Sequence, residues 1–144
     1  MPSEIVKEGK SIEEIEKILL AQDQVSIPLE HHFSDGLYSR QITVKKGIVL
    51  LGHKHKKTCL NILAQGAMLL KVNLEDEGHI ITAPHTFHTD PGSQKIAICL
   101  EDAVFINVFK TDERDLDKLE EELIDKSEYF LEHEKKNKLI EKGV

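Results

Sequence analysis

Apolar residues change their spacing twice along this chain, and each change indicates a different kind of element. Between Ile12 and Leu19 they recur at helical spacing. Ser11 and Glu14 form a capping box ahead of this stretch, and acidic residues fill its first turn. The pattern predicts a first helix that ends near residue 21.

From residue 25 to residue 110 the sequence consists of short apolar runs separated by turns that contain glycine or proline. No long helical pattern interrupts the series, so we expect an antiparallel sheet folded as a sandwich or barrel. The expected strands cover residues 26–33, 37–44, 48–52, 58–64, 67–74, 79–83, 95–100 and 103–109.

Beyond residue 110 helical spacing returns. Thr111 or Asp112 is expected to cap a helix whose apolar stripe runs from Leu116 to Ile124, with a bend at residues 125–127. This segment could cover the β domain or pack across a dimer. We therefore expect one domain, divided into an N-terminal tail and helix (1–24), a β domain (25–110) and a C-terminal helical segment (111–144).

Composition and charge limit the partners and the location that we expect for this protein. The 144 residues carry a formal net charge of −7, which argues against nucleic acid or an anionic membrane as the main partner. No apolar run approaches the length of a membrane helix, and no secretory signal is visible, so a cytoplasmic location is expected. Cys59 and Cys99 lie in apolar runs, where a free cysteine acts as a small hydrophobic residue.

A pair of histidines supplies the candidate chemistry. Residues two apart in a strand face the same side, so His53 and His55 should project together. Two imidazoles at this spacing suit a divalent transition metal such as Zn, Fe, Ni or Cu, given at least one further protein ligand.

The surroundings of this pair resemble the first sequence motif of the cupin superfamily. Gly47, the pair His53 and His55, and Gly66 stand at the motif's spacings, and Cys59 occupies the position of its glutamate ligand. The resemblance implies a single jelly-roll β-barrel of about eight antiparallel strands.

A second cupin motif is matched only in part. Gly78 and Pro84 are in register, whereas Thr89 stands where the third histidine ligand would be, and His88 is one residue away. The metal ligand set that the resemblance implies is therefore His53, His55 and a shifted His88, with Cys59 as a possible fourth ligand.

A wider resemblance extends over nearly the full chain, including residues 31–40, 60–63 and 111–115. Over these residues the chain is similar to a family of small cupin-like proteins that bacteriophages and prophages encode, a family without an established activity. The host cytoplasm would then be the setting.

Candidate ligand-binding residues are Tyr38, Arg40, Asn61 and His85. Tyr38 and Arg40 share one face of a strand, and if that face points inward they could hold an anionic ligand. We expect this face to point outward.

Three functions from different classes follow. The favoured hypothesis is an accessory protein that binds a small molecule or a metal without turnover. The alternatives are a metal-dependent cupin enzyme, an oxygenase or isomerase acting on a small polar metabolite, and a dimeric interaction module. A homodimer is expected, because exposed sheet edges are otherwise a hazard.

Overall fold

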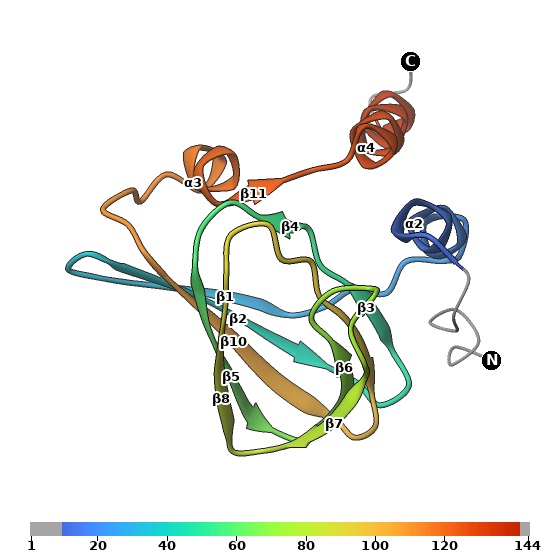
Figure 1. Ribbon diagram of the computed structural model, residues 1–144. Coiled ribbons are helices and arrows are strands. Elements are labelled where there is room, and N and C mark those ends of the chain that lie inside the picture. Colours follow the sequence, from blue (N-terminus) through green and yellow to red (C-terminus); the bar gives the residue numbers. More distant parts are fainter. Residues whose placement is uncertain (1–9, 142–144) are drawn as a thin grey trace.

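Two antiparallel sheets face each other in this computed structural model, which describes residues 10–141 and the side chains up to residue 134 (Figure 1). The larger sheet has the strand order β1-β2-β10-β5-β8 and the smaller one β3-β9-β6-β7. A two-stranded ribbon, β4 with β11, lies at one end. The strands are β1 (Leu29–Ser34), β2 (Leu37–Val44), β3 (Val49–Leu51), β4 (Lys54–His55), β5 (Cys59–Gln65), β6 (Ala67–Lys71), β7 (His79–Thr82), β8 (His85–Thr89), β9 (Ile96–Cys99), β10 (Ala103–Lys110) and β11 (Ile124–Asp125).

Each of the eight expected strands overlaps an observed one, and every pairing among the described strands is antiparallel. The strands β4, β8 and β11 were not expected. β8 contains a single apolar residue, Phe87, among polar ones, so its sequence lacks an apolar run. It forms because its backbone pairs with the edge of β5.

The main core fills the space between the sheets. It contains buried residues from both sheets, which are Val44, Leu63, Met68, Leu70, Ile81, Ala97, Cys99, Ala103 and Phe105. Gly66 makes the sharp turn from β5 into β6 with a φ of +91°, and an added Cβ there would collide with the carbonyl oxygen of Asp102.

The first helix, α2 (Ile12–Leu20), begins as expected, because the Ser11 hydroxyl accepts a hydrogen bond from the Glu14 amide at 3.1 Å. The expected cap of the next helix is wrong. α3 (Leu116–Leu123) begins after Asp115, whose carboxylate accepts from the amides of Asp117 and Lys118.

The side chain of Thr111 has another role, since its hydroxyl donates to Glu122 at 2.6 Å. α3 then buries Leu119 and Leu123 against Tyr38, Cys59 and Phe109 in a second, smaller apolar cluster.

The C-terminal segment closes one end of the two sheets (Figure 1). β11 pairs with β4, so that Ile124 lies opposite His55. The last helix, α4 (Glu128–Glu141), lies beside α2, where the Ser127 hydroxyl donates to Glu16. Within residues 10–141 no helix is both long and apolar enough to cross a membrane.

Candidate functional site

Each of the three central strands of the larger sheet places one polar residue on its inner face. On β2 this residue is Arg40, and its register partner on β10 is Asn107. Asn107 in turn pairs with Asn61 on β5. Paired residues on neighbouring strands face the same side, so the three side chains form one row about 10 Å long.

The row lies between the two apolar clusters. On one side are Ile42, Phe105 and Leu63, which belong to the main core. On the other side are Tyr38 and Phe109, which pack against α3. The row, together with Lys95 and His55, is called the polar layer below.

Lys95 enters the polar layer from the opposite sheet. Its backbone carbonyl accepts from the Gly52 amide at 2.9 Å, next to the histidine pair. Its ammonium group reaches the larger sheet, where it donates to Asn61 Oδ1 at 2.8 Å and lies 5.9 Å from the centre of the Phe105 ring. Burial lowers the pKa of Lys95 from 10.5 to about 8.

The side chain of Asn61 is fully buried and fixed in orientation. Its amide nitrogen lies within 3.4 Å of three acceptors, the carbonyl oxygens of Cys59 and Phe87 and the hydroxyl of Thr89. The amide oxygen therefore points towards Lys95, and no flipped arrangement satisfies the same partners.

His55 is only 7% exposed, and its ring packs edge-on against Phe109 with centroids 5.3 Å apart. Its Nδ1 atom is buried without a hydrogen-bond partner in the described structure. Burial lowers the pKa of His55 to about 3, and the positive charges of Lys95 and Arg40 add to this effect. The ring is neutral at physiological pH.

His53 precedes β4 and contacts the C-terminal helix, because Phe130 meets its ring edge-on at 4.5 Å. Burial first, and then the Lys126 charge, lower the pKa of His53. Both histidines of the pair are therefore covered by the C-terminal segment and held neutral.

Cys59 lies on the inner face of β5, fully buried beneath α3. Its sulfur is 3.6 Å from Asn61 Oδ1, the same oxygen that Lys95 contacts. Burial raises the pKa of the Cys59 thiol to about 11, so the group is a protonated thiol at neutral pH.

Two of the sequence-predicted site residues lie elsewhere. His88 pairs with Leu60, is 72% exposed and lies 3.8 Å from the Asp90 carboxylate, so the structure does not bring it to the His53–His55 pair. The reason is register, since Thr89 takes the buried position on β8. His85 is exposed at the other end of β8, beside Phe87.

The orientation expected for Tyr38 and Arg40 is wrong, because their shared face points inward, with Val44 at 1% exposure and Tyr38 at 4% on it. An aromatic stack with Phe33 and Phe109 holds Tyr38, whose hydroxyl lies 2.6 Å from His31 Nδ1. Arg40 remains exposed on this inner face, so the polar layer is open to solvent there.

Besides His55 Nδ1, two groups of the polar layer lack partners within the described part of the chain. Arg40 makes no hydrogen bond or ion pair to residues 10–134. The amide oxygen of Asn107 is buried and has no donor. Buried polar atoms are usually paired, so an unpaired acceptor beside an unpaired cation indicates a place for a ligand or for water.

Lys95 and Asn107 were not among the site residues predicted from the sequence. Asn107 could have been found, because it interrupts the inward series Ala103, Phe105 and Phe109 on β10. Lys95 carries no such signal. It precedes a buried apolar strand, where a lysine usually points to solvent.

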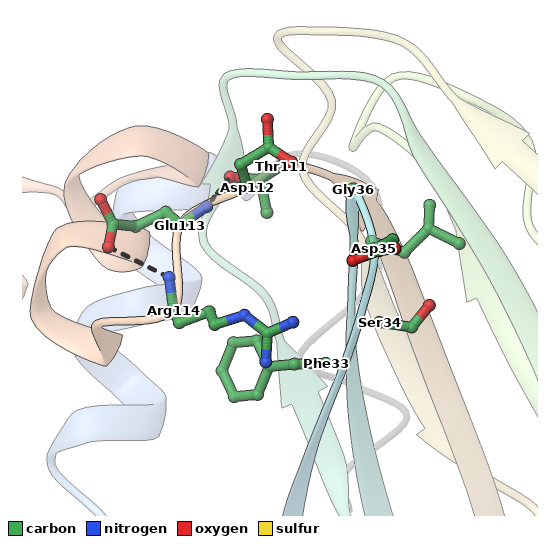
Figure 2. A pocket seen from close by; sticks show the side chains of 9 residues that line it. Phe33, Ser34, Asp35, Gly36, Thr111, Asp112, Glu113 and Arg114 are labelled. Atoms are coloured by element: carbon green, nitrogen blue, oxygen red, sulfur yellow. Dashed lines mark hydrogen bonds between the residues drawn. The ribbon is translucent and has the colours of Figure 1, made fainter.

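A hollow of about 100 Å³ lies where the β1–β2 turn meets the chain after β10 (Figure 2). Arg114 lies over the Phe33 ring at 5.6 Å, and the Glu113 carboxylate accepts from the Arg114 amide. None of the residues of the polar layer lines this hollow, so it is a separate surface feature.

Comparison with known proteins supports the fold but does not indicate a function. No protein-family model and no curated protein matches the sequence. Among solved structures, KdgF from Halomonas sp. is 20% identical, covers 68% of this chain and 91% of its own, and gives a TM-score of 0.54.

A double-stranded β-helix protein from Klebsiella pneumoniae is 12% identical over 62% of this chain and 80% of its own, with a TM-score of 0.52. An RmlC-like cupin from Methanocaldococcus jannaschii is 14% identical over 62% and 84%, with a TM-score of 0.51. The chain therefore has the cupin-type jelly-roll fold that the two sequence motifs predict. At these identities the likeness concerns the fold alone.

The cupin resemblance implies a metal, and the residues present do not fit one. Within the described residues no group of three or more His, Cys, Asp or Glu side chains could hold a metal ion. Metal-binding histidines normally donate their second ring nitrogen to a carbonyl or carboxylate, and His55 Nδ1 has no such partner. Two cations, Lys95 and Arg40, act on the same ring.

Proposed function

We propose that this protein binds a small organic anion, with a carboxylate and at least one hydroxyl, in the polar layer of its jelly roll. It acts as a binding protein without turnover. The observation that carries the proposal is the charge of the layer, in which Arg40 and Lys95 have no described carboxylate partner.

The chemistry of the two cations fits a carboxylate. A guanidinium group presents a planar fork that matches both carboxylate oxygens, and an ammonium group adds a point charge. Arg40 and Asn107 are register partners, so a ligand at Arg40 can also donate a hydroxyl to the unpaired Asn107 Oδ1. A hydroxy acid supplies both groups.

The resemblance to bacteriophage-encoded cupin-like proteins stays a prediction from the sequence. A phage-encoded protein of this kind would act in the host cytoplasm. The proposed function does not depend on that origin, because it rests on the side chains of the polar layer.

Calorimetric titration with matched acids and amides tests the proposal. Lactate and malate should bind, whereas lactamide and malamide should not. Arg40→Gln should weaken binding roughly tenfold to a hundredfold, as expected for a lost charge-assisted hydrogen bond. Arg114→Gln is the matched control, because it removes the same charge outside the polar layer.

Equal affinity for the acid and its amide would contradict the proposal, as would no binding of either. An equal loss in the two arginine variants would show that the effect is one of net charge. Mass spectrometry of molecules released by denaturing the purified protein then identifies the natural ligand.

We also propose a homodimer formed through the outer face of the larger sheet. This face presents Ile106 and Val108 on β10 beside Ile62 and Leu60 on β5, and Leu60 is 43% exposed. An apolar sheet face of this kind is typical of protein interfaces. Light scattering should give a dimer for the wild type and for Ile80→Glu on β7, and a monomer for Leu60→Glu. A monomeric wild type would contradict it.

A further inference from the structure

The row of polar residues on the larger sheet has a neighbour on the edge strand β1. Arg40 pairs there with His31, just as it pairs with Asn107 on β10. Paired residues face the same side of a sheet, so the His31 imidazole lies on the inner face beside the arginine. Burial first, and then the positive charge of Arg40, lower the pKa of His31. His31 is therefore a neutral ring at the β1 end of the row.

Tyr38 fixes which nitrogen of this ring carries the hydrogen. Its hydroxyl lies 2.6 Å from His31 Nδ1, and the two rings stack with their centroids 5.7 Å apart. Tyr38 is 4% exposed, and among the described residues His31 is the one partner of its hydroxyl. A buried hydroxyl needs an acceptor, so it donates to Nδ1. The neutral imidazole then has its own hydrogen on Nε2 and can donate it to a ligand.

The two cations of the polar layer lie on either side of Asn107. Arg40 is on β2, and the Lys95 ammonium is held at β5, where it donates to Asn61 Oδ1 at 2.8 Å. Neighbouring strands are about 5 Å apart, so the backbones at Arg40 and Asn61 are separated by about 10 Å, with β10 between them.

The two positive charges act on each other without a described carboxylate between them. After burial, the charge of Arg40 also lowers the pKa of Lys95. One carboxylate can neutralise only one of the two cations. A ligand with a carboxylate at each end can meet both, and the unpaired acceptor Asn107 Oδ1 lies between them.

We propose that the ligand of this site is a hydroxy dicarboxylic acid that lies along the row. One carboxylate accepts from the Arg40 guanidinium and from His31 Nε2. The hydroxyl between the carboxylates donates to Asn107 Oδ1. The second carboxylate accepts from Lys95, whose ammonium group has three hydrogens and gives one of them to Asn61. The inference rests on the proposed function and narrows its ligand to acids with a second carboxylate.

Calorimetric titration of the full-length protein at pH 7 with malate, lactate and succinate tests the inference. Malate should bind roughly tenfold or more tightly than lactate, because lactate has no second carboxylate for Lys95. Succinate should bind more weakly than malate, because it has no hydroxyl for Asn107.

The lysine variant assigns the second carboxylate. Lys95→Met removes the charge and keeps the length of the side chain, so it should remove the preference for malate over lactate. Lys54→Met, on the exposed lysine of β4, is the matched control and should keep the wild-type preference.

The histidine variant assigns the first carboxylate. His31→Leu should weaken malate and lactate alike, by roughly tenfold, and leave the ratio of their affinities unchanged. His32→Leu is the matched control, because His32 pairs with Ser39 on the other face of the same strand and is 64% exposed. It should bind both acids as the wild type does. If circular dichroism shows that His31→Leu is unfolded, His31→Ala takes its place with the same expected loss.

Equal affinity of the wild type for malate and lactate would overturn the inference and leave the proposed binding of an organic anion intact. A preference for malate that survives in Lys95→Met would overturn it as well, as would a folded His31→Leu protein with wild-type affinities. Failure of both malate and lactate to bind would contradict the proposed function itself, and this inference with it.

Discussion

The inner face of the larger sheet is built in two different ways along the same strands. Towards β6 and β9 it is an apolar core in which Leu63 is fully buried and Phe105 is 6% exposed. One row further along, the same strands carry Arg40, Asn107 and Asn61. The first region has apolar contacts on every side, whereas the second has buried polar atoms without partners.

The difference separates what stabilises this fold from what the fold can bind. Burial of apolar surface favours folding in proportion to area, while an unpaired buried polar atom costs free energy. A chain that kept only apolar residues on these strands would be more stable. The polar layer therefore makes sense as a binding surface, and variants on the two sides should respond in opposite ways.

The largest effect is expected in the apolar region. Leu63→Ala should lower the free energy of unfolding by about 3 kcal/mol, since it removes buried contacts and leaves a cavity. Ile80→Ala, on β7 and 68% exposed, should cost less than about 1 kcal/mol. Urea denaturation of both variants measures the contrast, and equal losses would contradict the placement of the core.

The next effect is a loss of stability in mild acid, arising from the polar layer. The pKa of His55 is about 3 in the folded protein against 6.5 for an ordinary histidine. Below pH 6.5 the unfolded chain binds a proton that the folded chain does not, so stability falls as the pH falls. At pH 5 this amounts to about 2 kcal/mol.

Denaturation midpoints at pH 7 and pH 5 measure this loss, over a range in which ordinary carboxylates stay ionised. His55→Gln should flatten most of the slope. A smaller slope remains, because burial also lowers the pKa of His53. A His55→Gln protein with the full wild-type slope would exclude His55 as its source.

Removing the buried charge of Lys95 should have a smaller effect of the opposite sign. We expect Lys95→Met to be more stable than the wild type at pH 7 by about 1 kcal/mol, because burying an uncompensated charge is costly. The pKa of Lys95 is about 8, so the wild-type lysine loses its charge above pH 8 and the difference between the two proteins should then shrink.

Chemical denaturation at pH 7 and pH 9 measures the difference in unfolding free energy between Lys95→Met and the wild type at each pH, with Lys54→Met as the exposed control. The same Lys95→Met variant should bind the organic anion more weakly. Lower stability at both pH values would mean that the hydrogen bond from Lys95 to Asn61 outweighs the cost of burying the charge.

The same contrast explains what the sequence could predict. Helical and alternating patterns located α2 and the eight expected strands, because each pattern reports burial of an apolar face. Polar residues at inward positions carry a signal too. Arg40, Asn61 and Asn107 each stand between apolar residues two positions away, and that pattern on three strands could have identified the row.

The remainder depended on contacts between distant segments. β8 forms by pairing with β5, and that register turns His88 outward and Thr89 inward. Lys95 reaches Asn61 across the space between the sheets, which no local spacing encodes. The orientation of Tyr38 and Arg40 was wrong for a similar reason, because an arginine in an alternating strand suggests the solvent side.

The smallest expected effect concerns the C-terminal segment that covers the histidine pair. Phe130→Ala removes the edge-on contact with His53 and should cost about 1 kcal/mol or less. Leu131→Ala, on the next residue of α4 and 48% exposed, is the matched control.

In the Phe130→Ala variant water reaches the His53 imidazole, and the pKa of His53 should rise towards 6.5, because burial is the main reason that it is low. NMR titration of the histidine ring protons follows His53 and His55 separately. A pKa that rises for His53 and stays near 3 for His55 would show that α4 covers only the outer member of the pair. Equal rises for both histidines would mean that α4 shields the whole polar layer from solvent. The C-terminal helix would then have to be counted as part of the polar layer.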